Sequence, residues 1–207
     1  MTNEPRPVAA RMSLWIKICG LTSEEGIAAA IDAGADAIGF VFAPSKRQVT
    51  AQRAAQLARV AKVPRIAVMQ HPSQALLDEV WDVFRPDVLQ TDADDLQALD
   101  VPQGLTVLPV VRSSRVPQNL PARMLFEGPV SGTGTTADWT QAADLAKQTQ
   151  LILAGGLNVR NVADAIRRVQ PFGVDVSSGV EKEPGIKDAA KIYEFVRAAR
   201  EAMEPRK

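Results

Sequence analysis

Residues 14–34 read LWIKICGLTSEEGIAAAIDAG, a stretch in which an apolar run is followed at once by a helical pattern. The apolar residues over 14–18 predict a β-strand. A hydroxyl side chain at 22 or 23 can cap the helix that follows, two glutamates occupy its first turn, and Gly34 is placed to end it. The only cysteine of the chain, Cys19, stands at the carboxyl end of the strand. The stretch therefore predicts one strand–helix unit.

The same order of strand and helix recurs along the whole chain. Further strands are predicted over 37–42, 65–69, 88–89, 106–111, 123–126, 151–153 and 173–176. Helices are predicted over 23–33, 50–61, 73–84, 138–147, 159–169 and 188–203, with a short fourth helix near 93–99 and a degenerate fifth over 112–121. Eight units of this kind predict an α/β fold, a single-domain (β/α)8 TIM barrel with a parallel sheet. An open doubly wound sheet is the alternative, although it usually has fewer strands at this length.

The bulk composition limits the number of domains and the class of partner. The 207 residues suffice for one domain, which we expect over 13–203, between a flexible N-terminal tail (1–12) and a C-terminal tail (204–207). The 24 basic and 24 acidic residues cancel, which argues against a nucleic-acid surface. One cysteine forms no internal disulfide. No apolar window is long enough to span a membrane and no signal peptide is recognised, so we expect no membrane partner and a cytoplasmic location.

In a (β/α)8 barrel, functional side chains lie at the carboxyl ends of the strands, and three of the residues that this rule selects have side chains suited to catalysis or binding. Cys19 is one; free cysteines more often simply pack, but this position favours chemistry, and a thiol acts as a base only as thiolate, which requires a lowered pKa. Glu127 follows an apolar strand, where a carboxyl group can have a raised pKa and act as general acid; a surface glutamate at a turn is the alternative. Arg47 can bind a carboxylate or phosphate, or it is a solvated loop arginine.

Two loops at the predicted strand ends are suited to an anion. Gly155 and Gly156 follow the seventh strand, and Ser177, Ser178 and Gly179 follow the eighth. Glycines allow backbone N–H groups to approach an anion, and a following helix adds its positive end. Either loop alone is consistent with a plain turn. Together they favour a phosphate group, as these two loops often bind one in this fold.

Three other polar residues have more ordinary interpretations. Asp175 interrupts the eighth strand; we favour a structural hydrogen-bonding role toward the loop amides and group it with the candidate substrate-binding residues. His71 precedes a proline and is expected to be an exposed turn residue, and Asp92 to be a loop residue. No cluster of His, Cys or Asp shows metal-ligand spacing, so no metal is predicted.

Several motifs, in order, resemble those of phosphoribosylanthranilate isomerases. They are KICGLT (17–22), GADAIGFVF (34–42) with SKR (45–47), SGTGTTADW (131–139), LAGGLN (153–158) and GVDVSSGVE (173–181). The resemblance extends over about residues 13–200. It implies a (β/α)8 barrel that converts N-(5-phosphoribosyl)anthranilate to 1-(2-carboxyphenylamino)-1-deoxy-D-ribulose 5-phosphate, an Amadori rearrangement in tryptophan biosynthesis, without a cofactor.

The resemblance also implies roles for individual residues. Cys19 would be the general base, Arg47 would bind the anthranilate carboxylate, and the last two loops would hold the phosphate. Two departures stand out: Glu127 replaces the family's usual aspartate as general acid, and QTDA (90–93) replaces the common Gln-Leu-His-Gly. The expected partner is a phosphorylated small molecule, and the chain is expected to be a monomer or homodimer. Another sugar-phosphate isomerase and a non-catalytic phosphate-binding barrel remain as alternatives.

Overall fold

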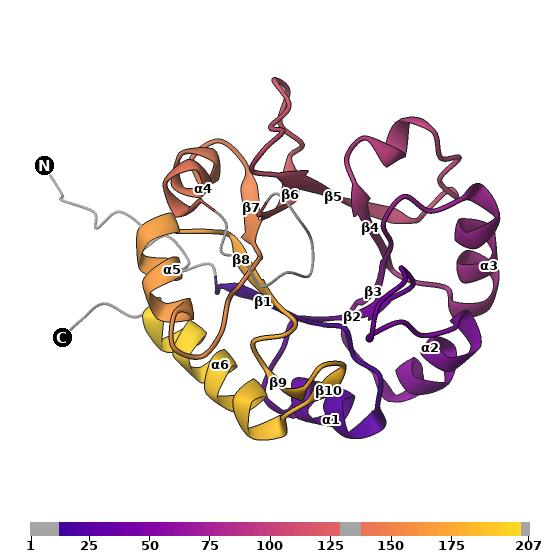
Figure 1. Cartoon of the computed structure of the whole chain (residues 1–207), viewed down its shortest axis with the longest axis horizontal. Helices are drawn as coiled ribbons and strands as arrows, with labels where there is room; N and C mark the ends of the chain where they lie inside the picture. Colours follow the sequence, from indigo (N-terminus) through magenta and orange to yellow (C-terminus); the bar gives the residue numbers. More distant parts are fainter. Residues whose placement is uncertain (1–12, 129–137, 204–207) are drawn as a thin grey trace, which may run out of the picture.

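The computed structural model describes residues 13–128 and 138–203, and within them eight parallel strands close into a barrel (Figure 1). The strands are β1 (Trp15–Cys19), β2 (Ala37–Val41), β3 (Arg65–Val68), β4 (Val88–Asp92), β5 (Thr106–Arg112), β6 (Arg123–Glu127), β7 (Gln150–Leu153) and β8 (Gly173–Val176). The barrel closes because β1 pairs with both β2 and β8. The predicted single-domain TIM barrel is confirmed. The two tails and most of the 131–139 motif lie outside the described residues.

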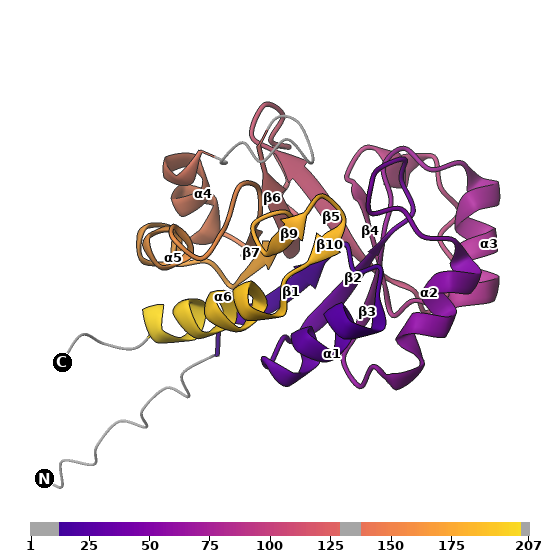
Figure 2. The same ribbon diagram turned by 60° about the horizontal axis from the view of Figure 1, so that its bottom comes forward.

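The helices form an outer layer around the strands (Figure 2). They are α1 (Glu24–Asp32), α2 (Ala51–Leu57) with the 3₁₀ turn η1 (Ala58–Val60), α3 (Gln74–Phe84), α4 (Trp139–Ala146), α5 (Val162–Val169) and α6 (Ala189–Ala202). Side-chain caps fix most helix starts; Ser23, for example, accepts a hydrogen bond from the Gly26 N–H. The predicted Gly34 terminus is also observed, with φ at +86°. Among the described helices, none is long and apolar enough to cross a membrane.

Three connections differ from a regular strand–helix repeat. After β4 there is only a 3₁₀ turn, η2 (Asp95–Gln97), and residues 113–122 after β5 form turns, so the short fourth and degenerate fifth helices are confirmed. A hairpin that the pattern did not predict, β9 (Glu181–Glu183) and β10 (Ile186–Lys187), follows β8. Its turn lies against the β1–α1 loop, where the Thr22 hydroxyl donates to the Gly185 carbonyl at 2.9 Å.

The spacing of apolar residues over 73–84 predicts that Ala75, Leu76, Val80 and Val83 share one face of α3, but only part of that face is buried. Leu77, Val80 and Phe84 are the buried residues, whereas Ala75 is exposed and Val83 is 39% exposed. The physical reason is the Phe84 ring, which packs on the rings of Phe40 and Phe42 at 5.1 and 5.7 Å between centroids. Aromatic burial therefore decides how the helix is turned against the sheet.

Alternation along the strands separates two apolar clusters. Ile16 and Ile18 of β1 are fully buried in the large cluster between the strands and the helices. The alternate residues of β1, Lys17 and Cys19, point to the opposite side, into the barrel. A second, smaller cluster fills part of that interior and contains Leu108, Val110, Leu125, Ile152 and Ala154. Polar residues on the same inward parity therefore gather at the carboxyl ends of the strands.

Candidate active site

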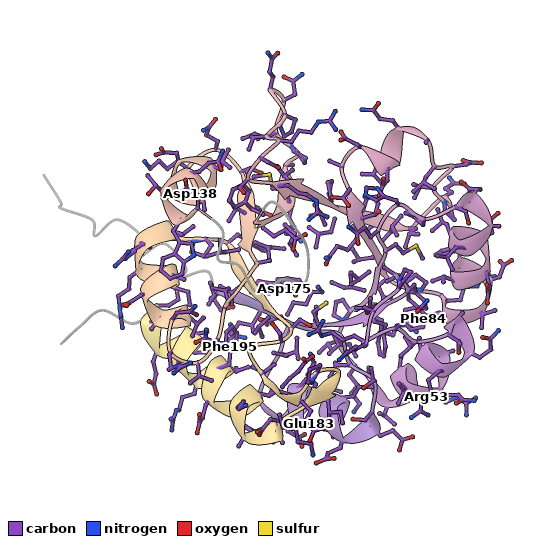
Figure 3. All side chains as sticks on the ribbon, in the orientation of Figure 1. Arg53, Phe84, Asp138, Asp175, Glu183 and Phe195 are labelled. Carbon is purple, nitrogen blue, oxygen red and sulfur yellow. The ribbon has the colours of Figure 1, made fainter. Side chains whose placement is uncertain are left out.

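A buried lysine crosses the interior of the barrel below its carboxyl rim. Lys17 of β1 has no solvent exposure, and its Nζ donates to Asp175 Oδ1 on β8 at 2.7 Å and to Gln90 Oε1 on β4 at 2.8 Å. Since β1 and β4 are not neighbours, the side chain must span the interior; Asp175 lies near the barrel centre in Figure 3. Burial lowers the pKa of Lys17, but Asp175 and Cys19 raise it more, so this pKa lies above its usual value. Lys17 is therefore a cation inside the barrel.

Cys19 lies on the same inward face as Lys17, two residues further along β1. A Cβ added at Gly39 of β2 would be 2.9 Å from Lys17 Cε and 3.0 Å from Cys19 Sγ, so both side chains lean over the space that this glycine leaves. Burial raises the pKa of the Cys19 thiol, and the Lys17 cation opposes this shift without reversing it. The thiolate of the free protein is thus a minor species at neutral pH, contrary to the lowered pKa that a base would require.

Arg47 meets a carboxylate that belongs to the chain itself. Its Nε and Nη2 donate to the two oxygens of Glu181 at 2.7 and 2.9 Å. This hydrogen bonding raises the pKa of Arg47 against the effect of burial. Lys187 also donates to Glu181, at 2.7 Å. Gly20, with φ at +73°, permits the arrangement, because a Cβ there would be 2.6 Å from Arg47 Cδ. Glu181 therefore holds Arg47 at the rim through Nε and Nη2, and the Nη1 group of the guanidinium does not contact Glu181.

Glu127 is connected to β4 through an arginine at the end of β5. Arg112 Nη1 donates to Glu127 Oε1 at 2.8 Å, and Arg112 Nη2 donates to Asp92 at 2.7 Å and 2.9 Å. Burial lowers the pKa of Arg112, but the two carboxylates raise it more, so the guanidinium stays charged. Asp92, expected to be a loop residue, is instead the buried last residue of β4.

The two glycine-containing loops lie side by side. Gly155 and Gly156 have φ values of +86° and +64°, which glycine adopts readily. Gly179 lies against the first loop: an added Cβ would be 1.9 Å from the carbonyl oxygen of Leu157. A small cavity of roughly 70 Å³ is lined by residues of both loops, including Ser177 and Ser178, and by Glu127 and Asp175.

A second cavity, of roughly 210 Å³, brings the candidates together. Cys19, Arg47 and Glu127 line it, from three different strand ends, with Asp175, Ser177 and Ser178. Of the nine predicted site residues, these six line this cavity, Gly155 and Gly156 line the smaller one that shares Glu127 and Asp175, and Gly179 supports the loops. Asp175 receives its hydrogen bond from Lys17 rather than from loop amides.

Pattern reasoning missed several polar partners of this site. Four of them are half-buried or buried and hydrogen-bonded to candidate residues: Lys17, Arg112, Glu181 and Lys187. A fifth, Gln90, is buried and accepts a hydrogen bond from Lys17. The alternation of side chains along a strand could have indicated two of them. Lys17 is two residues before Cys19 and shares its face of the strand, and Arg112 is on the same face as Leu108 and Val110. Which parity faces inward was not determined by the sequence.

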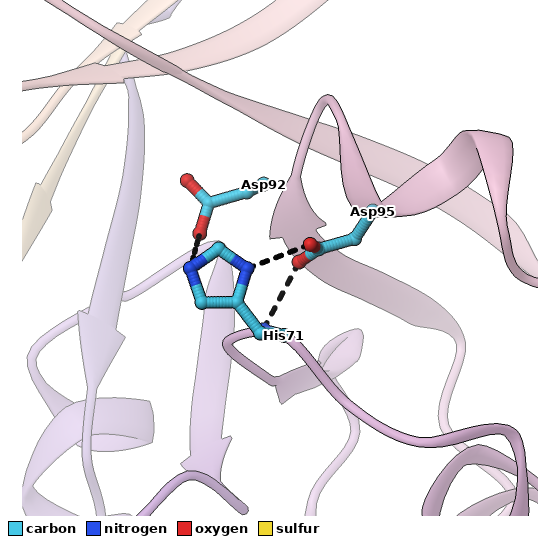
Figure 4. A group of neighbouring side chains, drawn as sticks. All are labelled: His71, Asp92 and Asp95. Atoms are coloured by element: carbon cyan, nitrogen blue, oxygen red, sulfur yellow. Dashed lines mark hydrogen bonds and ion pairs between the residues drawn. The ribbon is translucent and has the colours of Figure 1, made fainter.

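One other polar group lies beside the site (Figure 4). His71 Nδ1 lies 2.7 Å from Asp95 Oδ1, and Nε2 lies 4.0 Å from Asp92 Oδ2. The hydrogen bond to Asp95 raises the pKa of His71, which is an exposed turn residue as expected. Within the described residues these three side chains place ligand atoms within 4.8 Å of one another. Asp92 is already paired with the Arg112 cation, which disfavours a metal ion there.

Comparisons with known proteins show which family the chain belongs to. A family model described as N-(5'phosphoribosyl)anthranilate (PRA) isomerase matches residues 16–198. An N-(5'-phosphoribosyl)anthranilate isomerase of Streptococcus pneumoniae (strain Hungary19A-6) is 42% identical over 186 residues, which cover 87% of this chain and 93% of that protein. TrpF from Jonesia denitrificans has a crystal structure that matches with a TM-score of 0.79 and 37% identity, covering 94% of this chain and 100% of its own.

Two further solved structures bear on ligand and assembly. A phosphoribosyl anthranilate isomerase in complex with reduced 1-(o-carboxyphenylamino)-1-deoxyribulose 5-phosphate matches with a TM-score of 0.75 and 28% identity, over 91% of this chain and 99% of its own. A crystal structure of monomers generated from the dimeric phosphoribosylanthranilate isomerase of Thermotoga maritima matches with a TM-score of 0.77 and 29% identity. The match covers 91% of this chain and 99% of that chain.

The barrel fold, the residues at its rim and these comparisons together define a (β/α)8-barrel isomerase of a phosphorylated sugar. Within that class, the chain belongs to the phosphoribosylanthranilate isomerase family. It is an isomerase of tryptophan biosynthesis that acts on N-(5'-phosphoribosyl)anthranilate. This family membership decides against the two alternatives that the sequence left open, another sugar-phosphate isomerase and a non-catalytic phosphate-binding barrel.

Proposed function

We propose that Cys19 and Glu127 carry the two proton transfers of this isomerisation. Glu127 donates a proton to the furanose ring oxygen while the bond from C1 to that oxygen breaks, which leaves an iminium between C1 and the anthranilate nitrogen. The Cys19 thiolate then removes the C2 proton, and the C–H electrons form the C1–C2 double bond of an enolamine. Tautomerisation of the enolamine gives the ketone. The observation that supports the assignment is that both side chains line one cavity from different strands.

The raised pKa of Cys19 decides when this step can occur. Lys17 is the cation on the same inward face, and its charge stabilises the thiolate that forms as the proton is taken. Free thiol dominates at neutral pH, so we expect activity to rise as pH increases toward the pKa of Cys19. An acid that must stay protonated and a base that must lose its proton then give a bell-shaped profile.

Two groups of residues at the rim orient the substrate. We assign the anthranilate carboxylate to Arg47, whose Nη1 edge is not used by Glu181. We assign the phosphate to the loops that contain Gly155, Gly156, Ser177, Ser178 and Gly179, while Asp175 anchors Lys17 and faces the bound sugar. Fixing both ends of the substrate lowers the entropic part of the barrier.

The test is steady-state kinetics that follow the loss of substrate fluorescence. Cys19→Ser and Glu127→Gln should each lower kcat by about 10²–10⁴-fold with little change in KM, because each removes one positioned proton-transfer group. Arg47→Gln should instead act mainly on KM. A Cys19→Ser variant with near wild-type kcat would remove the thiol from the mechanism, and an active Glu127→Gln variant would move the acid role elsewhere.

The remaining assignments are coarser. A relative is crystallised with a reduced product analogue and another is described as dimeric. We propose that this chain takes a phosphorylated small molecule, no nucleic acid, and acts in the cytoplasm as a monomer or homodimer. We keep the domain over 13–203. Size-exclusion chromatography with light scattering determines the assembly state.

A further inference from the structure

Glu127 and a second carboxylate, Asp92, both accept hydrogen bonds from Arg112, and neither Asp92 nor Arg112 has been given a role so far. Asp92, Arg112 and Glu127 end three neighbouring strands, β4, β5 and β6. Registers bring them together: Asp92 pairs with Val110, two residues before Arg112, and Arg112 pairs with Glu127. All three side chains are at most 17% exposed.

The guanidinium divides its nitrogens between the two acids. Nη1 donates to Glu127 at 2.8 Å, and Nη2 donates to both oxygens of Asp92 at 2.7 and 2.9 Å. Glu127 therefore has a fixed donor on one oxygen, while the cation that supplies it is already neutralised by Asp92. A cation paired with Glu127 alone would favour the carboxylate and oppose proton donation.

We propose that Arg112 is a positioning residue for Glu127, and that Asp92 is the counter-charge that leaves Glu127 able to bind and release a proton. The inference rests on the proposed role of Glu127 as general acid.

Other charged groups face this trio from every side of the rim. His71, from the β3–α3 loop, is 4.0 Å from Asp92, and its protonation adds a second positive charge there. Asp175 from β8 and Cys19 from β1 line the same cavity as Glu127, and Lys17 neutralises Asp175. Within the described residues, Arg112 is the cation that contacts Glu127 directly.

Two substitutions should shift the titration of Glu127 in opposite directions. Asp92→Asn keeps the size of the side chain and a hydrogen-bond acceptor but removes the counter-charge, so the Glu127 midpoint should move down by about one pH unit. Arg112→Gln removes the cation and leaves two facing carboxylates, so the midpoint should move up by a similar amount. Arg112→Lys keeps the charge but not the forked geometry, so the midpoint should stay while kcat/KM falls about 10-fold or more.

The experiment uses carbon-13 NMR of glutamate-labelled protein, in which the Glu127 carboxyl signal is assigned by its loss in Glu127→Gln. Asp94→Asn is the matched control: it removes one negative charge two residues from Asp92, where the exposed carboxylate pairs with Arg115. His71→Gln separates the titration of the imidazole. Opposite shifts in Asp92→Asn and Arg112→Gln, absent in Asp94→Asn, support the proposal. Unchanged or parallel shifts overturn it.

Kinetics distinguish this proposal from the assignment of Glu127 as acid. The limb of the kcat/KM profile that belongs to Glu127 should move with its NMR midpoint in Asp92→Asn. If the NMR midpoint moves while the kinetic limb does not, the charge sharing stands and the role of Glu127 as acid fails. If Arg112→Gln does not fold, the sign of the Asp92→Asn shift alone decides: a downward shift supports the proposal, and no shift or an upward shift rejects it.

Discussion

Replacing Lys17 with methionine removes a buried cation without leaving a large void. Lys17 has no exposure and Asp175 is 10% exposed at its side chain, so solvent screening of the pair is weak. Removing one partner of a buried pair costs about 3–5 kcal/mol, because the other charge is left uncompensated. With an m-value of about 2–3 kcal/mol/M, the urea midpoint should fall by about 1–2 M.

The same substitution acts separately on the thiol. Lys17 is the main charge that opposes the effect of burial on the Cys19 pKa, so its loss raises that pKa further and depletes the thiolate. We expect kcat/KM at neutral pH to fall by about 100-fold, the lower range for a positioned proton-transfer step. Circular dichroism during urea titration and the fluorescence assay measure the two effects independently.

A double variant separates stability from chemistry. Lys17→Met with Asp175→Asn removes both charges and should recover most of the lost stability, because neither charge remains buried alone. Activity should stay low, since the cation near the thiol is still missing. Asp175→Asn alone is the control, because it keeps Lys17 and removes an anion that raises the Cys19 pKa. Recovery of activity together with stability in the double variant would refute an electrostatic role of Lys17.

Two other predictions concern the loops and the pH dependence of stability. Gly179→Ala should raise KM at least about 10-fold, because the new Cβ would clash with the Leu157 carbonyl at 1.9 Å and separate the two loops. The control is Gly104→Ala, in which the new Cβ meets no atom within 4 Å. This variant should leave KM unchanged despite its backbone strain. Burial raises the pKa of Glu181, but hydrogen bonds from Arg47 and Lys187 lower it more. The folded pKa is thus below the unfolded value, so its stabilisation is present above about pH 4.5 and is lost as pH falls below it. Urea midpoints at pH 7 and pH 4 should therefore differ less in Glu181→Gln than in the wild-type chain.

The order of elements and most of the rim were predictable from local patterns. Strand and helix bounds follow from apolar periodicity and from caps such as Ser23, because these depend on neighbours within one turn. The candidate site followed once the barrel rule was applied, since parallel strands place all their carboxyl ends on one rim. This is why Cys19, Arg47 and Glu127 were found although more than 100 residues separate the first from the last.

What the sequence determined by itself is therefore the barrel, its rim and the family. The tertiary structure alone decided which strand parity faces inward, and with it the partners of each site residue. Lys17 and Cys19 point into the barrel, and closure between β1 and β8 places Asp175 in register beside the lysine. The sharing of Arg112 between Asp92 and Glu127 depends on registers of three strands, and the raised pKa of Cys19 depends on burial among distant residues. Charges interact through space, and no local pattern records the distance between them.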